Sequence, residues 1–102
     1  MTIHVLAAAQ LEAVDAADWY DDQSPGRGQQ FLTQVRATIA RIAAHPRAFS
    51  RVPRPPRGYD VREVMVDRFF WKITYAVIGG DVRVLSVTHS GRRSQPWRRR
   101  LP

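Results

Sequence analysis

The sequence contains no cysteine and no apolar run long enough to cross a membrane. The first absence excludes disulfides, cysteine-based zinc sites and thiol nucleophiles. The second excludes a transmembrane helix, and no basic-then-apolar leader follows Met1, so we expect a cytoplasmic protein without membrane contact. The three histidines, His4, His45 and His89, are too scattered to suggest a metal site. We therefore expect neither a metal nor a cofactor.

Lysine and acidic residues are also scarce. Arginine supplies all but one of the 16 basic residues, nine residues are acidic, and the formal net charge is +7. Five of the acids lie in residues 1–24, which contain no Lys or Arg, so the rest of the chain is strongly basic. Because the planar guanidinium suits phosphate and carboxylate, this composition predicts an anionic partner. A generally arginine-rich proteome is the alternative explanation.

The length of 102 residues and a hydrophobic content of 44% predict one domain spanning residues 1–102. A short strand is expected at residues 2–5, followed by a helix from Ala9 to about Gln23 with small residues on its buried stripe. Ser24 and Pro25 are expected to begin a second helix that ends before Pro46. The expected stripes are Ala9, Ala13, Ala16, Ala17 and Tyr20 in the first helix, and Phe31, Val35, Thr38, Ile39 and Ile42 in the second.

Proline and arginine dominate residues 46–57, which we expect to form a loop. Three strands then follow, the last two joined by a turn at Gly79-Gly80, and residues 95–101 suit a short helix. The order β-α-α-β-β-β indicates an α+β fold, in which a helical hairpin packs on one face of a small antiparallel sheet and leaves the other face open. The predicted core is Phe31, Val35, Ile39, Ile42, Ile73 and Tyr75.

Enzyme motifs are scarce, and the chemistry-bearing residues that remain are cations near the expected sheet. Such a cluster can bind phosphates, or stabilise the charge that develops in phosphodiester cleavage while His89 transfers a proton. Two members also have structural interpretations: Arg62 can pair with a neighbouring acid, and Trp97 can be a core residue that holds the C-terminal segment. The paired acids Asp21 and Asp22 are interpreted as solvated at a helix end. The cluster consists of Arg62, Lys72, His89, Arg92 and Arg93.

Three segments together resemble the RelE/ParE superfamily of bacterial toxins, often labelled plasmid-stabilisation proteins. They are "AAAQLEAVDAADWYDDQSPGRGQQFLTQVRATIARIAAHPRAF", "VREVMVDRFFWKITYAV" and "VRVLSVTHSGRRSQPWRRRL". The features that carry the resemblance are Trp19-Tyr20, Ser24-Pro25-Gly26, Phe31, His45-Pro46, the "KITYAV" strand and His89-x-x-Arg92 followed by Trp97. The resemblance covers nearly the whole chain, implies the same helical-hairpin fold, and places the arginine-rich end inside the domain.

The resemblance implies the toxin of a type II toxin–antitoxin pair, which arrests growth and is neutralised by a cognate antitoxin. RelE-like members are ribosome-dependent mRNA endoribonucleases, whereas ParE-like members interfere with DNA gyrase and are not themselves enzymes in that role. The ribonuclease candidates here are Lys72, His89, Arg92 and Arg93. Glu63 and Met65 stand where the ribonucleases place paired lysines, so the ParE-like function is favoured.

Three functions therefore remain as hypotheses: a gyrase-directed toxin, a ribosome-dependent endoribonuclease, and a basic nucleic-acid-binding module without toxin activity. The expected partners are the antitoxin and either gyrase or the ribosome with its mRNA, in a homodimer or a toxin–antitoxin hetero-oligomer. The predicted target-binding residues are Arg62, Lys72, Arg92, Arg93, Trp97, Arg98 and Arg99.

Overall fold

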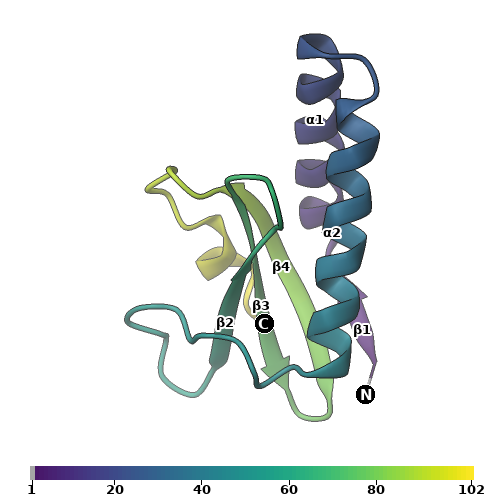
Figure 1. Cartoon of the computed structure of the whole chain (residues 1–102). Coiled ribbons are helices and arrows are strands. Elements are labelled where there is room, and N and C mark those ends of the chain that lie inside the picture. Colours follow the sequence, from purple (N-terminus) through teal and green to yellow (C-terminus); the bar gives the residue numbers. More distant parts are fainter. Residues whose placement is uncertain (1) are drawn as a thin grey trace.

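A computed structural model describes residues 2–102 and shows a helical hairpin packed against a four-stranded sheet (Figure 1). The chain order β-α-α-β-β-β and the α+β class are confirmed. A 3₁₀ helix near the C-terminus confirms the short helix expected there. The elements are β1 (Ile3–Val5), α1 (Ala7–Gln23), α2 (Arg27–Ala44), β2 (Asp60–Met65), β3 (Trp71–Ile78), β4 (Asp81–His89) and η1 (Pro96–Arg100).

The sheet has the strand order β1-β4-β3-β2 and is antiparallel through β2, β3 and β4. At its other edge β1 runs parallel to β4, with Ile3 beside Val82 and Val5 beside Val84. The wholly antiparallel sheet expected from the sequence is therefore wrong at this edge. The helical hairpin returns the chain to the end of the sheet where β1 begins, and two further reversals give β4 the same direction as β1.

Both helices bury the stripes that their sequence periodicity predicts. All four alanines of the α1 stripe are buried, which lets the helix approach the sheet and α2 closely. Of the predicted core, Ile39 is partly buried against the main cluster and the other residues are buried. The helix phasing is thus confirmed. The buried members are Phe31, Val35, Ile42, Ile73 and Tyr75.

The turn between the helices differs from the expectation. The N-cap of α2 is Gly26, at φ 89°, and not Ser24, whose side chain makes no capping hydrogen bond. Asp21 in the last turn of α1 supplies the acceptor instead, because its Oδ1 accepts from the backbone N–H groups of Gly26 (3.2 Å) and Gly28 (2.8 Å). A carboxylate satisfies the free N–H groups at a helix N-terminus better than a hydroxyl does. Asp21 is therefore not merely solvated.

A β-bulge explains why the alternation of β4 is hard to interpret from sequence. Thr74 pairs with Ser86 and Tyr75 pairs with Val84, so Leu85 is the extra residue. The bulge shifts the alternation along β4. As a result, Val84 and Val87 both join the helix-facing core, whereas Leu85 joins a second cluster on the outer face, the side of the sheet away from the helices.

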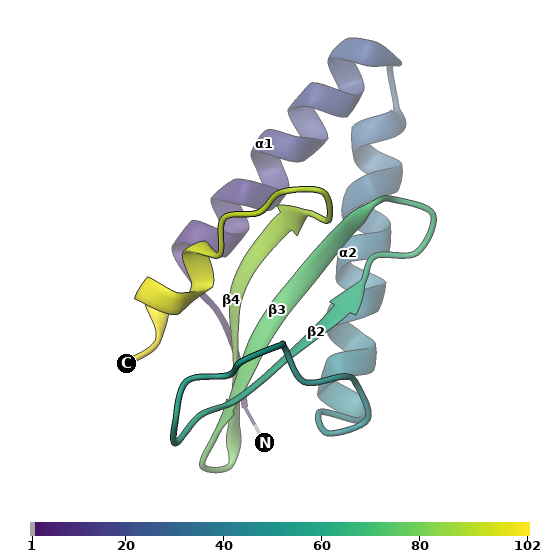
Figure 2. The ribbon, with the colours of Figure 1, turned by 90° about the vertical axis from the view of Figure 1, so that its left-hand side faces the viewer.

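The outer face is not left open, contrary to the expectation. The loop after α2 and the C-terminal segment cover part of it, and Trp97 is only 2% exposed there. Figure 2 shows the chain after β4 turning back so that η1 lies beside the start of α1. The alternation of polar and apolar residues along the strands could not predict this second core cluster, because the residues that form it are distant in sequence. They are Val52, Val61, Ala76, Leu85 and Trp97.

Tyr75 on β3 anchors the beginning of the loop that follows α2. Its hydroxyl donates to the backbone carbonyl oxygen of Pro46 at 2.6 Å, and the side chain is fully buried. Burial raises the pKa of Tyr75 to about 12, the Arg62 guanidinium nearby lowers it in part, and Asp60 adds a smaller increase. The phenol is therefore held in its neutral, donating form.

We expect the folded state to lose stability between pH 10 and pH 12 as Tyr75 ionises. The folded-state pKa lies above the unfolded value, so its contribution is complete below pH 10 and is lost as the pH rises through about 12. The loss should approach about 2–3 kcal/mol. Urea unfolding of the wild type and Tyr75→Phe across this range measures it as the difference between the two curves. Parallel pH dependence of the two proteins would contradict the assignment.

Candidate functional site

An ion pair between Glu12 on α1 and Arg100 on η1 closes the exposed edge of β4. The short strand β1 covers β4 only as far as Val84. Beyond that point, Arg100 Nη1 donates to Glu12 Oε1 (2.7 Å) and to the Leu85 carbonyl oxygen (2.9 Å), and Glu12 Oε1 accepts from the Val87 N–H (3.1 Å). We call this arrangement the Glu12–Arg100 clasp. No local pattern indicates this pairing, because the two residues are 88 positions apart.

The clasp divides the C-terminal arginines into structural and free residues. Arg100 is held in it, and Arg98 lies over the Trp97 ring at 4.5 Å and donates to the backbone oxygen of Arg54 at 3.0 Å. Arg99 is exposed and has no ion pair or side-chain hydrogen bond within residues 2–102. Trp97 is buried in the second core cluster, which agrees with the structural interpretation that the sequence left open.

Arg62 also serves the fold. Its Nε lies 2.9 Å from Asp60 Oδ1, and its Nη1 donates to the carbonyl oxygens of Arg47 (2.9 Å) and Phe49 (2.8 Å). The side chain is 12% exposed. These contacts hold the loop after α2 against β2, which is the structural interpretation left open by the sequence. A target cannot reach this guanidinium without displacing the loop.

Lys72 and His89 lie on opposite faces of the sheet. His89 pairs with Trp71 and therefore shares its face of the sheet, whereas Lys72 is the next residue along β3 and points to the opposite face. Lys72 Nζ lies 3.6 Å from Glu63 Oε2, in a hollow that it shares with Met65. His89 instead lines a pocket on the helix side. The structure therefore does not bring the ribonuclease candidates together, although Arg92 lies in the same pocket as His89.

The ring of His89 is fixed by its neighbours. Its Nδ1 accepts from the Gly91 N–H at 3.1 Å, and a Cβ at position 91 would lie only 3.3 Å from that nitrogen. The ring also packs edge-to-face on Phe70 and Trp71. Since Nδ1 is occupied as an acceptor, the neutral ring carries its proton on Nε2. His89 is thus placed to donate a hydrogen bond and lacks a free lone pair for use as a base.

The helix-side pocket, which we call the aromatic pocket, lies between α1 and β4. Trp71 Nε1 donates to the Tyr20 hydroxyl at 2.9 Å, and Trp19 is 56% exposed. Neither Trp19 nor Tyr20 was a site candidate from the sequence, because nothing local places α1 beside residues 71 and 89. The lining is Glu12, Asp15, Ala16, Trp19, Tyr20, Trp71, Val87, His89 and Arg92.

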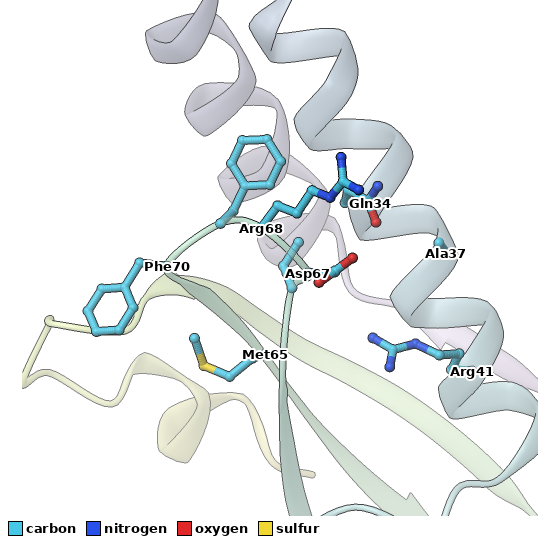
Figure 3. Close-up of a pocket in the computed structure, with 9 residues that line it drawn as sticks. Gln34, Ala37, Arg41, Met65, Asp67, Arg68 and Phe70 are labelled. Carbon is cyan, nitrogen blue, oxygen red and sulfur yellow. The ribbon is translucent and has the colours of Figure 1, made fainter.

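A second concave surface, which we call the basic groove, lies between α2 and the turn that joins β2 to β3 (Figure 3). Arg41 extends from α2 toward this turn, and Arg68 lies on the turn itself. Phe70 and Met65 supply exposed apolar surface at its rim, at 61% and 45% exposure. None of these residues was a candidate from sequence. The groove is lined by Gln34, Ala37, Arg41, Met65, Val66, Asp67, Arg68, Phe69 and Phe70.

No helix in residues 2–102 is long and apolar enough to span a membrane. The same residues contain no group of three or more histidine or acidic side chains that could hold a metal ion.

The arrangement of a helical hairpin on a four-stranded sheet has a counterpart among solved structures. A solved structure of a chromosomal ParDE toxin–antitoxin system from P. aeruginosa superposes with a TM-score of 0.65, at 15% identity, over 87% of this chain and 95% of that one. No curated protein matches. The family model for the ParE toxin of the type II toxin–antitoxin system parDE matches residues 3–94. The chain therefore belongs to the ParE toxin family, and this membership implies an antitoxin partner.

We expect Arg100→Gln to lower the free energy of unfolding by about 1–3 kcal/mol, because it removes a charged donor from Glu12 and from the Leu85 carbonyl. Hydrogen exchange at the Val87 amide should also accelerate, since its acceptor Glu12 loses its anchor. Urea unfolding and amide exchange measure the two effects. Arg99→Gln, an adjacent change in an exposed residue, is the matched control. Equal stability of the two variants would show that the clasp does not hold the C-terminal segment.

Proposed function

We propose that this protein is a growth-arresting toxin that interferes with DNA gyrase and is neutralised by a cognate antitoxin in the cytoplasm. Membership of the ParE family supports the toxin class. The observation that carries the choice of target is the separation of Lys72 and His89 onto opposite faces of the sheet. The resemblance to ParE-like toxins then points to gyrase as the target.

Metal-free RNA cleavage needs cations and a proton-transfer group directed at one phosphate. Here the Lys72 ammonium is paired with Glu63, and Met65 next to it contributes no charge. His89 uses Nδ1 as an acceptor on the other side of the sheet. These positions do not assemble a ribonuclease centre, so a non-enzymatic action on a macromolecular target agrees better with the geometry.

The surface that we assign to the target is smaller than the set predicted from sequence. Arg62, Trp97, Arg98 and Lys72 are engaged within the domain. Arg92, Arg93 and Arg99 are exposed, and none makes an ion pair within the described residues. The Glu12–Arg100 clasp holds the segment that carries them. We propose that these three arginines meet an acidic patch of gyrase or the phosphates of its DNA.

The antitoxin is proposed to be acidic and to order on binding, as a segment that neutralises a basic toxin would. The basic groove fits such a segment, since Arg41 and Arg68 supply positive charge and Phe70 offers apolar surface. This groove is separate from the arginines assigned to the target.

We expect the purified protein to inhibit gyrase supercoiling, to trap cleaved DNA, and to leave mRNA on translating ribosomes intact. A triple variant of Arg92→Gln, Arg93→Gln and Arg99→Gln should raise the concentration needed for inhibition at least roughly tenfold, equivalent to about 1.4 kcal/mol. The matched control replaces three other exposed arginines by glutamine, at Arg36, Arg57 and Arg83, and loses the same charge.

If the two triple variants lose inhibition equally, the loss is explained by net charge alone, which would contradict the assigned surface. Cleavage of mRNA on ribosomes that is lost in Lys72→Ala, with gyrase unaffected, would contradict the proposed target and favour the endoribonuclease.

A further inference from the structure

The aromatic pocket has the form of a ligand site, and it shares Arg92 with the arginines proposed to contact the target. Its volume of about 660 Å³ is typical of small-ligand pockets, which span roughly 300–1,000 Å³. Trp19 is more than half exposed although it is a large apolar side chain. The hydrogen bond from Trp71 to Tyr20 fixes the adjoining wall. The pocket therefore presents flat apolar surface that is already ordered.

The polar groups around these rings carry both signs of charge. Arg92 lies at the pocket and Arg93 follows it in an exposed position. Of the two acids in the lining, Glu12 is occupied by Arg100, whereas Asp15 makes no ion pair within residues 2–102. His89 offers its Nε2–H because Nδ1 is occupied. A ligand at this site thus meets aromatic faces, a cationic rim, one free carboxylate and one imidazole donor.

These features discriminate between classes of ligand. A cationic side chain would suit Asp15 but would be opposed by Arg92, Arg93 and the net charge of +7. An acidic peptide would suit the arginines but would bring its carboxylates toward Asp15. A nucleotide carries a flat ring and a negative phosphate, and of the two DNA pyrimidines cytosine alone has an exocyclic amine that can donate a hydrogen bond to a carboxylate. Of these three classes of ligand, the nucleotide matches the groups in the pocket best.

We propose that the aromatic pocket binds one unstacked base of a single DNA strand, with preference for cytosine over thymine. The base stacks against Trp19, Asp15 accepts from the exocyclic amine, and Arg92 and Arg93 contact the flanking phosphates. His89 donates to the ring carbonyl that both pyrimidines carry. This binding goes beyond the proposed action on gyrase and requires neither gyrase nor the antitoxin.

The test is a fluorescence titration of the full chain with oligo(dC) and oligo(dT) of about fifteen nucleotides, at neutral pH and low salt. Trp19 and Trp71 line the pocket, whereas Trp97 is buried on the outer face and gives a constant background. Both oligonucleotides should quench the emission, oligo(dC) should bind roughly fivefold more tightly, and added salt should weaken both.

Variants separate the parts of the proposal. Asp15→Ala should abolish the preference for oligo(dC) without weakening oligo(dT), whereas Asp18→Ala, an equal change on the exposed side of α1, should preserve it. Arg92→Gln should lower the affinity for both oligonucleotides several-fold and reduce the salt dependence of binding, as loss of a phosphate contact does. Trp19→Ala should lower the affinity for both oligonucleotides, and Trp19→Phe should restore most of it. Competition titrations measure the affinity of these two variants.

Absence of quenching by either oligonucleotide, or equal behaviour of Asp15→Ala and Asp18→Ala, would overturn the proposal. Binding that Arg92→Gln and Trp19→Ala leave unchanged would also overturn it, because the strand would then lie elsewhere. Gyrase inhibition by a protein that fails this test would leave the proposed function intact, so the two failures are distinguishable.

Discussion

The ion pair between Glu12 and Arg100 is the contact on which the remainder of this structure depends. An exposed strand edge invites pairing with other chains, and β1 is too short to cover β4 beyond Val84. The pair supplies the missing donor and acceptor to Leu85 and Val87. It thereby joins the first helix, the central strand and the C-terminal segment. Trp97 completes this attachment by packing on the outer face of the sheet.

The same ion pair sets the chemistry of the surface. Arg100 forms an ion pair with Glu12, so Asp15 is the acid of the aromatic pocket that has no ion pair within residues 2–102. Because η1 is held in place, Arg99 stays exposed while Arg98 lies on Trp97. Arginine-rich composition alone overstates the ligand-binding charge of this protein. Three arginines donate hydrogen bonds to backbone carbonyl oxygens in the domain's own loops and at its strand edge: Arg62, Arg98 and Arg100.

The sequence predicted the features that depend on local periodicity. The stripes of both helices, the core residues such as Phe31 and Tyr75, and the element order all follow from spacing and propensity. The predicted start of α2 was wrong. Asp21, seven residues before Gly28, provides the acceptor that Ser24 was expected to supply. Such a cap depends on how two helices meet, which a local pattern does not contain.

The candidate site was less predictable, because it depends on register and on distant contacts. The bulge at Leu85 changes which residues of β4 face the helices, and no residue type marks it in the sequence. The placement of Lys72 and His89 on opposite faces required the ladder that pairs Trp71 with His89. The aromatic pocket joins the end of α1 to residues more than fifty positions away, so its residues were seen separately and not as one site.

We propose that this member of the ParE toxin family acts on DNA and not on translation. The most direct test of this proposal is to induce the protein in cells without antitoxin and follow incorporation of labelled thymidine and labelled amino acids over the first minutes. If the protein acts on gyrase, DNA synthesis should stop first, with broken chromosomes and intact mRNA. Protein synthesis that stops first, with mRNA cut on ribosomes while DNA synthesis continues, would contradict it.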